Sequence, residues 1–415
     1  MIDIKKALKT VLFAILPSFR RLVLTLTIAA LVAIVCVLIY NSPPRQYTSV
    51  NLVIDWSYDP RSLYPFDKGF EYNILLDPHC HTTYSDGSLT PEQNILFHIA
   101  NGYNAMIVTD HNELRGSLVA QQIAREKYND KIKVLTGLEW SNCRCHLNFI
   151  GINQTITPIK NPTDQDIQNA IKQVHDIGGI VIYNHRPWST WSSLDSPTIQ
   201  QFAAWGVDYF DIANTYYFDM QTLFYARSIN AGICTANDFH SSTPATGWTI
   251  YNAPNTNYNA SEPINASYFT EETLFELIKS KNNSFLFDVT GTGHDIRTTK
   301  TKNPTYDLLN VFIKIGQFFH SYYILNRGVY SFVNGENCGD QSVYLDKAQI
   351  RYTVMWFSVF FIGFEILRAI LVLVYKFCKM KWLQRRLTPK ISTKTYSLAF
   401  DEFGVDDAPL LNMSL

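Results

Sequence analysis

The sequence predicts an α/β protein, in which strands and helices alternate to form a closed or nearly closed (β/α) barrel flanked by two transmembrane helices. Two observations indicate this class. Between residues 73 and 290, short apolar runs alternate with longer polar or amphipathic stretches, and this alternation is typical of parallel sheets. Toward each end of the chain lies one long apolar stretch. An open doubly wound sheet is the alternative, although no Gly-rich phosphate loop follows the first strand.

The expected strands are short apolar runs. They cover Ile74–Leu76, Ala105–Thr109, Ile132–Leu138, His146–Ile152, Gly179–Tyr183, Tyr209–Ala213, Gly232–Ala236 and Phe285–Val289. The first expected helix begins after Thr90, because threonine caps helix N-termini and a proline follows it at the first helical position. The other expected helices cover Asn112–Lys127, Asp164–Ile177, Ser196–Trp205, Asp219–Asn230 and Thr270–Ser280.

Two stretches are long and apolar enough to cross a membrane. Leu22–Tyr40 carries no charge and follows several basic residues, and the sequence after it is a poor cleavage site, so we expect an uncleaved anchor and not a signal peptide. Tyr352–Tyr375 is the second expected span, and a basic stretch without acids follows it. Since basic flanks stay in the cytosol, we expect both termini there and residues 41–351 on the lumenal or extracellular side.

These features divide the chain into seven expected parts. They are a cytosolic N-terminus (1–21), a transmembrane helix (22–40), a tether (41–72), the barrel domain (73–290), a lumenal block without an assigned role (291–351), a second transmembrane helix (352–375) and a cytosolic tail (376–415). Within the unassigned block, Leu308–Phe319 is amphipathic but interrupted by polar residues. We expect an interfacial or packing helix there and not a third span.

Short motifs agree with a two-pass membrane glycoprotein. Four glycosylation sequons fall inside the expected lumenal region, at Asn153, Asn259, Asn265 and Asn282. In the tail, Asp406 with Leu410 and Leu411 is similar to an acidic dileucine sorting signal. The expected location is therefore an endomembrane (endosome, lysosome or vacuole) or the plasma membrane.

The second span carries two charges, Glu365 and Arg368, three residues apart on one helical face. Charges inside a membrane are functional candidates. Here, a mutual ion pair that eases insertion or a contact with a partner helix is the plainer interpretation.

Charge and cysteine usage exclude some function classes. A net charge of −1 argues against a general nucleic-acid binder that relies on a basic surface. The seven cysteines form no CxxC framework, so neither a zinc finger nor a disulfide scaffold is indicated. Cys143 and Cys145 could hold zinc as thiolates, pair with Cys80, Cys234 or Cys338, or stay reduced.

Histidines and acids gather where the expected strands end, which is the edge of a barrel that carries the chemistry. His79 and His81 lie two residues apart, so on a strand both can point at one ion. The full set is His79, His81, Asp86, His111, Glu139, His146, His185, Asp238 and His240. Mixed imidazole and carboxylate ligands suit zinc, manganese or iron. The remaining histidines, His98, His175, His294 and His320, are interpreted as structural.

The motifs HCHTTYSDG, TDHN, GLE followed by a histidine, NHRP and DFH, in this order, resemble the PHP family, named for polymerase and histidinol phosphatase. The resemblance covers residues 73–290. It implies a distorted (β/α)7 barrel with two or three divalent metal ions. One ion would be held by His79, His81, Glu139 and Asp238; a second by Glu139, His146 and His185; a third by Asp86, His111 and His240.

The resemblance also implies hydrolysis of phosphate esters, either phosphomonoesters or phosphodiesters. Metal ions that share a carboxylate would supply a bridging hydroxide as the nucleophile. We expect Glu139, Asp238, His185 and Arg186 to be the catalytic residues, although Arg186 departs from the family pattern. Arg186, and less directly Arg144 and Arg115, could clamp the phosphate. Trp140, Trp188 and Trp191 are candidates for the pocket wall. The neutral charge and the membrane tether argue against a nucleic-acid substrate. The alternative from another class is a non-catalytic, metal-stabilised receptor or assembly subunit.

Overall fold

The computed structural model describes residues 4–241, 243–254, 258–293, 297–326, 328–339 and 342–387. The chain forms two compact units. The larger unit runs from Ala33 to Asp346, and the smaller one joins the N-terminal part up to Val32 with the chain from Lys347 onward. His294 and the predicted sorting signal at Asp406, Leu410 and Leu411 lie outside the described residues.

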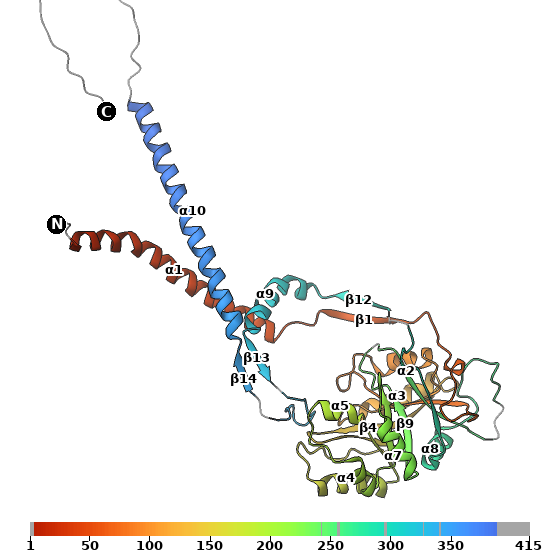
Figure 1. Ribbon diagram of the computed structural model, residues 1–415. Helices are drawn as coiled ribbons and strands as arrows, with labels where there is room; N and C mark the ends of the chain where they lie inside the picture. The colour runs from red at the N-terminus through yellow and green to blue at the C-terminus, as the bar shows by residue number, and fades with distance from the viewer. Residues whose placement is uncertain are drawn as a thin grey trace, which may run out of the picture. The chain divides into compact units, whose positions relative to one another are not determined.

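The smaller unit consists of helical segments from α1 (Ile4–Asn41) and α10 (Lys347–Leu387) (Figure 1). By length and composition, Leu16–Asn41 and Lys347–Arg386 are each able to cross a membrane. The Glu365 carboxylate forms the predicted ion pair with Arg368 at 3.0 Å, and it also pairs with Arg21 of α1 at 2.5 Å. Glu365 therefore already has cationic partners within this chain.

A ten-stranded sheet forms the centre of the larger unit. Along the sheet the strand order is β11-β10-β2-β3-β4-β5-β6-β7-β8, and β9 pairs with β7. The strands are β2 (Ile74–Cys80), β3 (Ala105–Val108), β4 (Lys133–Ser141), β5 (His146–Ile150), β6 (Ile180–Tyr183), β7 (Tyr209–Asn214), β8 (Tyr217–Phe218), β9 (Gly232–Ala236), β10 (Gly247–Tyr251) and β11 (Ser284–Phe287).

The sheet curls back on itself, so that the chain after β9 meets the end of β2. Cys80 forms a parallel bridge with Phe239. The His81 amide donates to the Phe239 carbonyl at 2.9 Å, and the Asp238 amide donates to the His79 carbonyl at 3.0 Å. The predicted α/β class is confirmed, and the curl brings the first and last predicted ligand segments together.

The expected parallel sheet contains antiparallel strands at three places. One is the short strand β8, which was not expected and which pairs antiparallel with β7. β5 runs antiparallel to both β4 and β6, because only the segment 142–145 connects β4 to β5 and a parallel connection needs a long crossover. β10, which the sequence analysis missed, joins β2 and β11 antiparallel. No predicted helix separates β9 from β10, so the alternating pattern gave no signal for it.

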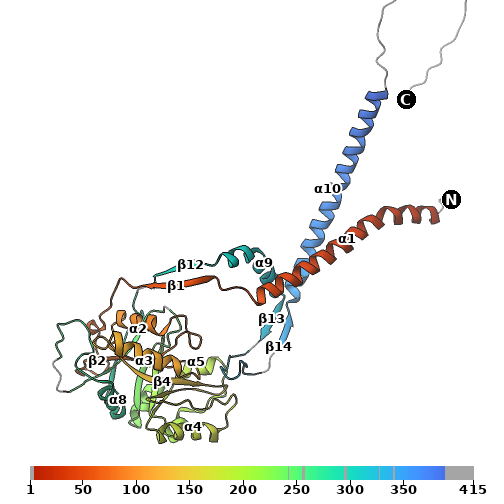
Figure 2. The same cartoon turned by 180° about the vertical axis from the view of Figure 1, so that it is seen from behind.

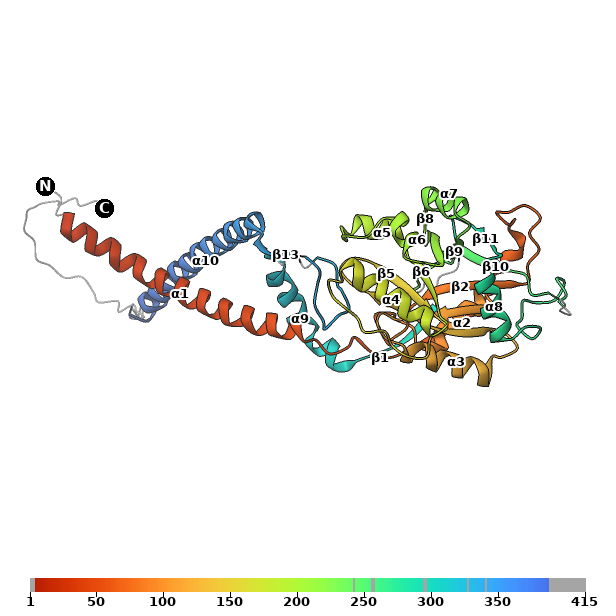
Figure 3. The ribbon, with the colours of Figure 1, turned by 90° about the horizontal axis from the view of Figure 1, so that it is seen from below.

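Helices cover the strands on more than one side; in Figure 3, α2 and α3 lie on one side of them and α7 on the other. α3 begins later than predicted because Asn112 has a left-handed backbone (φ 52°) that no helix accepts. α5 was not predicted and begins directly after His185. The helices are α2 (Pro91–Ala100), α3 (Arg115–Lys127), α4 (Asp164–Asp176), α5 (Arg186–Trp191), α6 (Ile199–Ala204), α7 (Met220–Ser228) and α8 (Glu271–Ser280).

The predicted tether and the unassigned block contain regular structure. β1 (Tyr47–Val53) pairs antiparallel with β12 (Arg297–Lys302), and Figure 2 shows the two strands side by side. The expected helix at Leu308–Phe319 is present within α9 (Pro304–His320). β13 (Tyr323–Asn326) and β14 (Ser342–Leu345) form a further antiparallel pair, and a short 3-10 helix, η1, covers Pro60–Ser62.

The core is apolar and tightly filled around β10. Trp248 is completely buried, stacks on Tyr58 and Tyr103 with ring centroids 5.6 Å away in each case, and donates its indole N–H to the Asn101 carbonyl. This residue ties β10 to the C-terminal end of α2 and to the segment before η1. Removing it would leave a large cavity.

We therefore expect Trp248→Ala to lower the free energy of unfolding by about 3–5 kcal/mol. Trp191, which is 63% exposed, provides the matched control, and Trp191→Ala should change that free energy by less than about 0.5 kcal/mol. Thermal or denaturant unfolding of the full chain in detergent measures both. Equal losses in the two variants would contradict the packing described for β10.

Candidate metal centre

The carboxyl end of β2 supplies the first residues of the site. His79 belongs to the strand and His81 follows it directly, and both side chains are fully buried. Because alternate residues of a strand share a face, the two imidazoles point the same way, and their Nε2 atoms lie 3.1 Å apart. The predicted pairing of these histidines is present in the structure.

Glu139, at the end of β4, is the centre of the cluster. Its carboxylate is fully buried. Four imidazole nitrogens lie close to its two oxygens: His111 Nδ1 at 2.6 Å, His185 Nε2 at 3.1 Å, His146 Nδ1 at 3.2 Å and His79 Nε2 at 3.4 Å. A single carboxylate therefore connects residues from four different strand ends.

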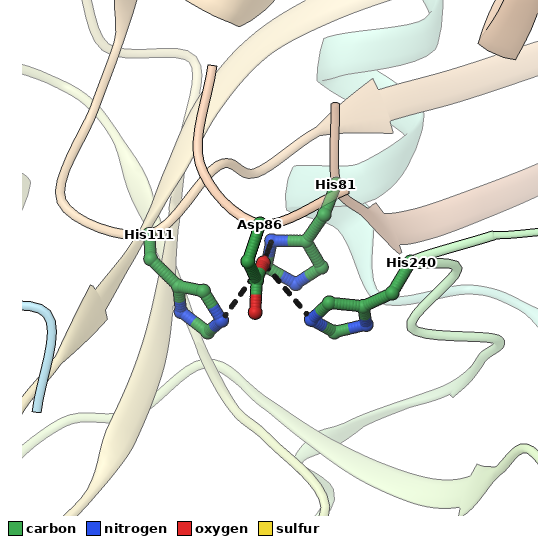
Figure 4. Close-up of side chains that lie close together, drawn as sticks. All are labelled: His81, Asp86, His111 and His240. Atoms are coloured by element: carbon green, nitrogen blue, oxygen red, sulfur yellow. Dashed lines mark ion pairs between the residues drawn. The ribbon is translucent and has the colours of Figure 1, made fainter. Parts of the chain in front are cut away.

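Two further carboxylates complete the cluster. Asp238 Oδ1 lies 2.9 Å from His81 Nε2 and 3.2 Å from His79 Nε2. Asp86 Oδ1 lies 3.2 Å from His240 Nε2 and 3.7 Å from His111 Nε2, and Figure 4 shows these imidazoles gathered around the Asp86 carboxylate. The turn that carries Asp86 needs glycine next to it, since a Cβ at Gly87 would lie 2.5 Å from the His81 backbone.

The nine predicted ligands fall into four groups whose donor atoms lie within 4.8 Å of one another. The groups are His79, His81 and Asp238; His79, Glu139 and His185; His111, Glu139 and His146; and His81, Asp86, His111 and His240. Glu139 belongs to two groups, as expected for a bridging ligand. His79, His81 and His111 each stand in one more group than the predicted ligand sets gave them.

The backbone is strained at several of these positions. His185 and Asp238 have positive φ angles of 26° and 52°. Such angles are uncommon for residues other than glycine, and strained backbone of this kind concentrates at functional sites. The surrounding hydrogen bonds hold the strain in place.

Three buried aspartates support the ligand segments, and the sequence analysis did not assign them a role. Asp77 accepts from the backbone amides of His79 and Asn237, and it also pairs with His98 at 3.1 Å. Asp110, inside the TDHN motif, binds Thr82 and Ser85 at 2.7 Å. Asp211 accepts from the amide of His185. Of these three aspartates, only Asp110 lies inside one of the motifs quoted in the sequence analysis.

Electrostatics within the cluster are strongly coupled. Burial by itself would raise the pKa of Glu139, but the fields of His111, His146 and His79 hold that pKa well below its usual range. Burial opposes protonation of His79 and His240, yet Asp238 and Glu139 raise the pKa of His79 to about 9, and Asp86 raises the pKa of His240 to about 10. Burial dominates at His111 and lowers its pKa to about 3.

The residues fit divalent metal ions. Among the described residues, the buried atoms His146 Nε2 and His185 Nδ1 have no hydrogen-bond partner, which is costly unless an ion or another ligand binds nearby. Six imidazoles and three carboxylates are ligand types that zinc, manganese and iron accept. Within the part of the chain that the structure describes, no cysteine belongs to a candidate metal group, so the thiolate alternative gains no support.

The predicted arginine clamp is not aimed at the cluster. Arg186 donates to Asp219 and Gln221, both at 2.7 Å, and Arg144 pairs with Asp164 at 2.7 Å. Arg115 lies on the surface in a pair with Glu113. The phosphate-binding role of Arg186 stays a prediction, and it would require the guanidinium to leave these partners.

A cavity of about 280 Å³ opens onto the cluster. Of the three tryptophans proposed as walls, Trp188 lines this cavity, whereas Trp140 is buried in the core and Trp191 is exposed. The other non-ligand walls are Val329, Tyr330 and Phe332, from the block that had no predicted role. A disulfide between Cys143 and Cys338 accompanies them, which is one of the pairings left open by the sequence.

Fold and site together describe a barrel-like α/β protein with a multinuclear candidate metal centre at its strand ends. In comparisons with known proteins, residues 77–217 match the family model of the PHP domain. A 5'-3' exoribonuclease of Haemophilus influenzae is 31% identical over 101 residues, which make up 23% of this chain and 35% of that protein. The match thus spans about a third of the relative's length.

Solved structures with a related outline are more distant in sequence. A two-domain protein from Bacteroides vulgatus, described as containing a predicted PHP-like metal-dependent phosphoesterase, is 14% identical with a TM-score of 0.42, and the match covers 69% of this chain and 77% of that one. An amidohydrolase from Chromobacterium violaceum is 15% identical with a TM-score of 0.33, covering 51% of this chain and 97% of that one. Identities this low leave the substrate open.

Replacing Glu139 tests the centre of the site. We expect Glu139→Gln to lower the metal content of the purified full chain at least about tenfold. The substitution removes the negative charge of the carboxylate that two candidate metal groups share, while it keeps the shape of the side chain. Glu276→Gln is the control, since its carboxylate is exposed and lies outside the cluster. Elemental analysis after dialysis measures both, and full metal occupancy in Glu139→Gln would contradict the assignment.

Metal uptake should depend on pH in a defined direction. The raised pKa values of His79 and His240 mean that these groups hold protons at neutral pH when no ion is bound. An ion must displace those protons, so the apparent affinity for metal should increase as the pH rises toward about 10, the higher of the two pKa values, and decrease steadily as the pH falls below about 9. Calorimetric titration in two buffers of different ionisation enthalpy measures the protons released; no release on metal binding would contradict this account.

Proposed function

We propose that this chain is a membrane-anchored, metal-dependent phosphoesterase whose catalytic domain is a PHP-type barrel over residues 73–290. The observation that carries the proposal is the gathering of six histidines and three acids into four groups of donor atoms, two of which share Glu139. The curl of the sheet, which brings the end of β2 to the chain after β9, supports a barrel of this type.

The chain's own residues have distinct roles in the proposed reaction. Glu139 and Asp238 place negative charge between the histidine groups and keep the donor atoms in register. Divalent ions bound there would supply Lewis-acid polarisation of a phosphoryl oxygen and an acidified water. His146 Nδ1 and His185 Nε2 face the Glu139 carboxylate at 3.2 and 3.1 Å, and both residues line the cavity.

The substrate class is narrowed by the cavity. A volume of about 280 Å³ lies at the lower end for ligand sites, which favours a small phosphomonoester or the terminal phosphate of a longer molecule. The exoribonuclease name of the Haemophilus relative makes a phosphodiester the second candidate. A net charge of −1 supports small esters over a long nucleic acid.

We also propose a two-pass topology with residues 41–351 on the lumenal or extracellular side. The disulfide Cys143–Cys338 is typical of an oxidising compartment. Three of the four sequon asparagines, Asn153, Asn259 and Asn282, are exposed and accessible to glycosylation. In this arrangement residues 1–21 and 376–415 are cytosolic.

The activity test uses the full chain in detergent, loaded with Mn²⁺ or Zn²⁺ and offered para-nitrophenyl phosphate and bis-para-nitrophenyl phosphate. We expect hydrolysis of at least one ester, which metal removal abolishes and Glu139→Gln lowers at least about a hundredfold. Glu276→Gln should retain the wild-type rate. A folded, metal-loaded sample that hydrolyses neither ester would favour the alternative of a non-catalytic, metal-stabilised receptor or assembly subunit.

A further inference from the structure

The segment 328–338, named here the late loop, closes on itself. The Cys338 amide donates to the Val329 carbonyl at 2.7 Å, and Tyr330 bridges to Asn337. Ser331 binds the Glu336 carbonyl through both its amide and its hydroxyl, at 3.0 and 2.6 Å. These short-range bonds give the loop a defined shape even though it contains little regular structure.

Three contacts fasten the late loop to the barrel. Cys338 forms its disulfide with Cys143, which lies in the short connection between β4 and β5 and therefore next to two ligand-bearing strands. Lys160 pairs with Glu336 at 2.6 Å, and Asn112 donates to the Phe332 carbonyl at 3.4 Å. Asn112 directly follows His111, so the loop is attached beside the metal centre.

The late loop turns its aromatic residues into the cavity. The Phe332 ring stacks on the His111 imidazole with centroids 3.6 Å apart and planes 20° apart, and Tyr330 meets Phe332 edge-on at 4.7 Å. Phe332 adopts a left-handed backbone (φ 57°), which is rare for a bulky residue. The fold thus maintains an unfavourable backbone conformation that places this ring in the cavity wall.

The cavity has two chemically different sides. Six of its lining residues are predicted metal ligands, and the remaining four are Trp188, Val329, Tyr330 and Phe332. None of these four carries a charge. Trp188 approaches His146 and His185 with ring centroids 5.0 and 4.9 Å away, so aromatic rings from two separate parts of the chain flank the ligand cluster.

We propose that Trp188, Val329, Tyr330 and Phe332 form a subsite for a flat organic group, such as an aryl or nucleobase-like ring, attached to the phosphate. This inference rests on the proposed function and names its substrate class. Aromatic walls favour planar groups through stacking and burial. The uncharged lining gives no ionic partner to a sugar phosphate or an acidic side group, so a compact polar ester would gain little from these walls.

The late loop also makes this subsite a feature that the barrel strands alone do not provide. Residues 77–217, which match the PHP domain model, end before the loop begins. Because a disulfide fixes the loop beside β4 and β5, preference for the organic group depends on a segment distant in sequence from the ligands.

The test compares an aromatic with a compact ligand on the metal-loaded full chain. Calorimetry with phenylphosphonate and methylphosphonate, neither of which can be hydrolysed as an ester, measures the subsite without requiring turnover. We expect the wild type to bind phenylphosphonate at least about tenfold more tightly. Phe332→Ala and Tyr330→Ala should each reduce this preference at least about threefold, while metal content stays unchanged. Phe224→Ala, in an exposed position on α7, is the control and should keep the preference.

The outcomes separate the two proposals. Equal binding of the two phosphonates by the wild type would overturn the subsite, whatever the chain hydrolyses. A preference for phenylphosphonate without hydrolysis of any ester would contradict the proposed function and leave the subsite standing. The double variant Cys143→Ser with Cys338→Ser provides a second measurement that keeps the Phe332 side chain and releases the loop. It should lower the phenylphosphonate preference. An unchanged preference in this variant and in Tyr330→Ala would also overturn the inference.

Discussion

The burial of Glu139 among four imidazole nitrogens is the constraint on which the rest of the structure depends. A fully buried carboxylate is costly unless opposite charges and hydrogen bonds surround it. Its partners come from the carboxyl ends of β2, β3 and β6 and from the first residue of β5. The four strands must therefore bring these ends to the same edge of the sheet in the correct register. The curled sheet meets this requirement, and the reversal of β5 delivers His146 within a few residues of Glu139.

A layer of polar residues behind the ligands supports the same constraint. Asp77 and Asp110 fix the backbone around His79 and His81, and Asp211 fixes His185 from below the strand ends. In front, the Phe332 ring covers His111. The site is therefore supported from behind by these aspartates and covered in part by the late loop, which shares the uncharged cavity wall with Trp188 of α5. The loop is attached through one disulfide and two weaker contacts.

The sequence could predict that these nine side chains lie close together, because most of them stand in short motifs at the ends of apolar runs and parallel strands bring such ends together. That they bind metal stays a prediction. The α/β class followed from the alternation of short apolar runs with longer polar or amphipathic stretches. The sequence could not predict that Phe332 lies in the cavity wall, since a phenylalanine in a loop carries no signal of what it contacts. Nor could it choose among the cysteine pairings, because Cys143 and Cys338 are 195 residues apart. β1 and β12 were also missed, because β1 lacks a regular alternation of apolar residues and β12 contains none, so only their pairing with each other defines them.

The central claim is that Glu139 holds metal ions together at the strand ends. Anomalous X-ray scattering from crystals of the full chain, recorded on both sides of the absorption edge of the loaded metal, tests it most directly. The account predicts at least two peaks beside the Glu139 carboxylate, separated by about 3.5–4 Å as in two-metal sites. Crystals in which Glu139 contacts only histidines, with no anomalous peak in the cluster at saturating metal, would contradict it.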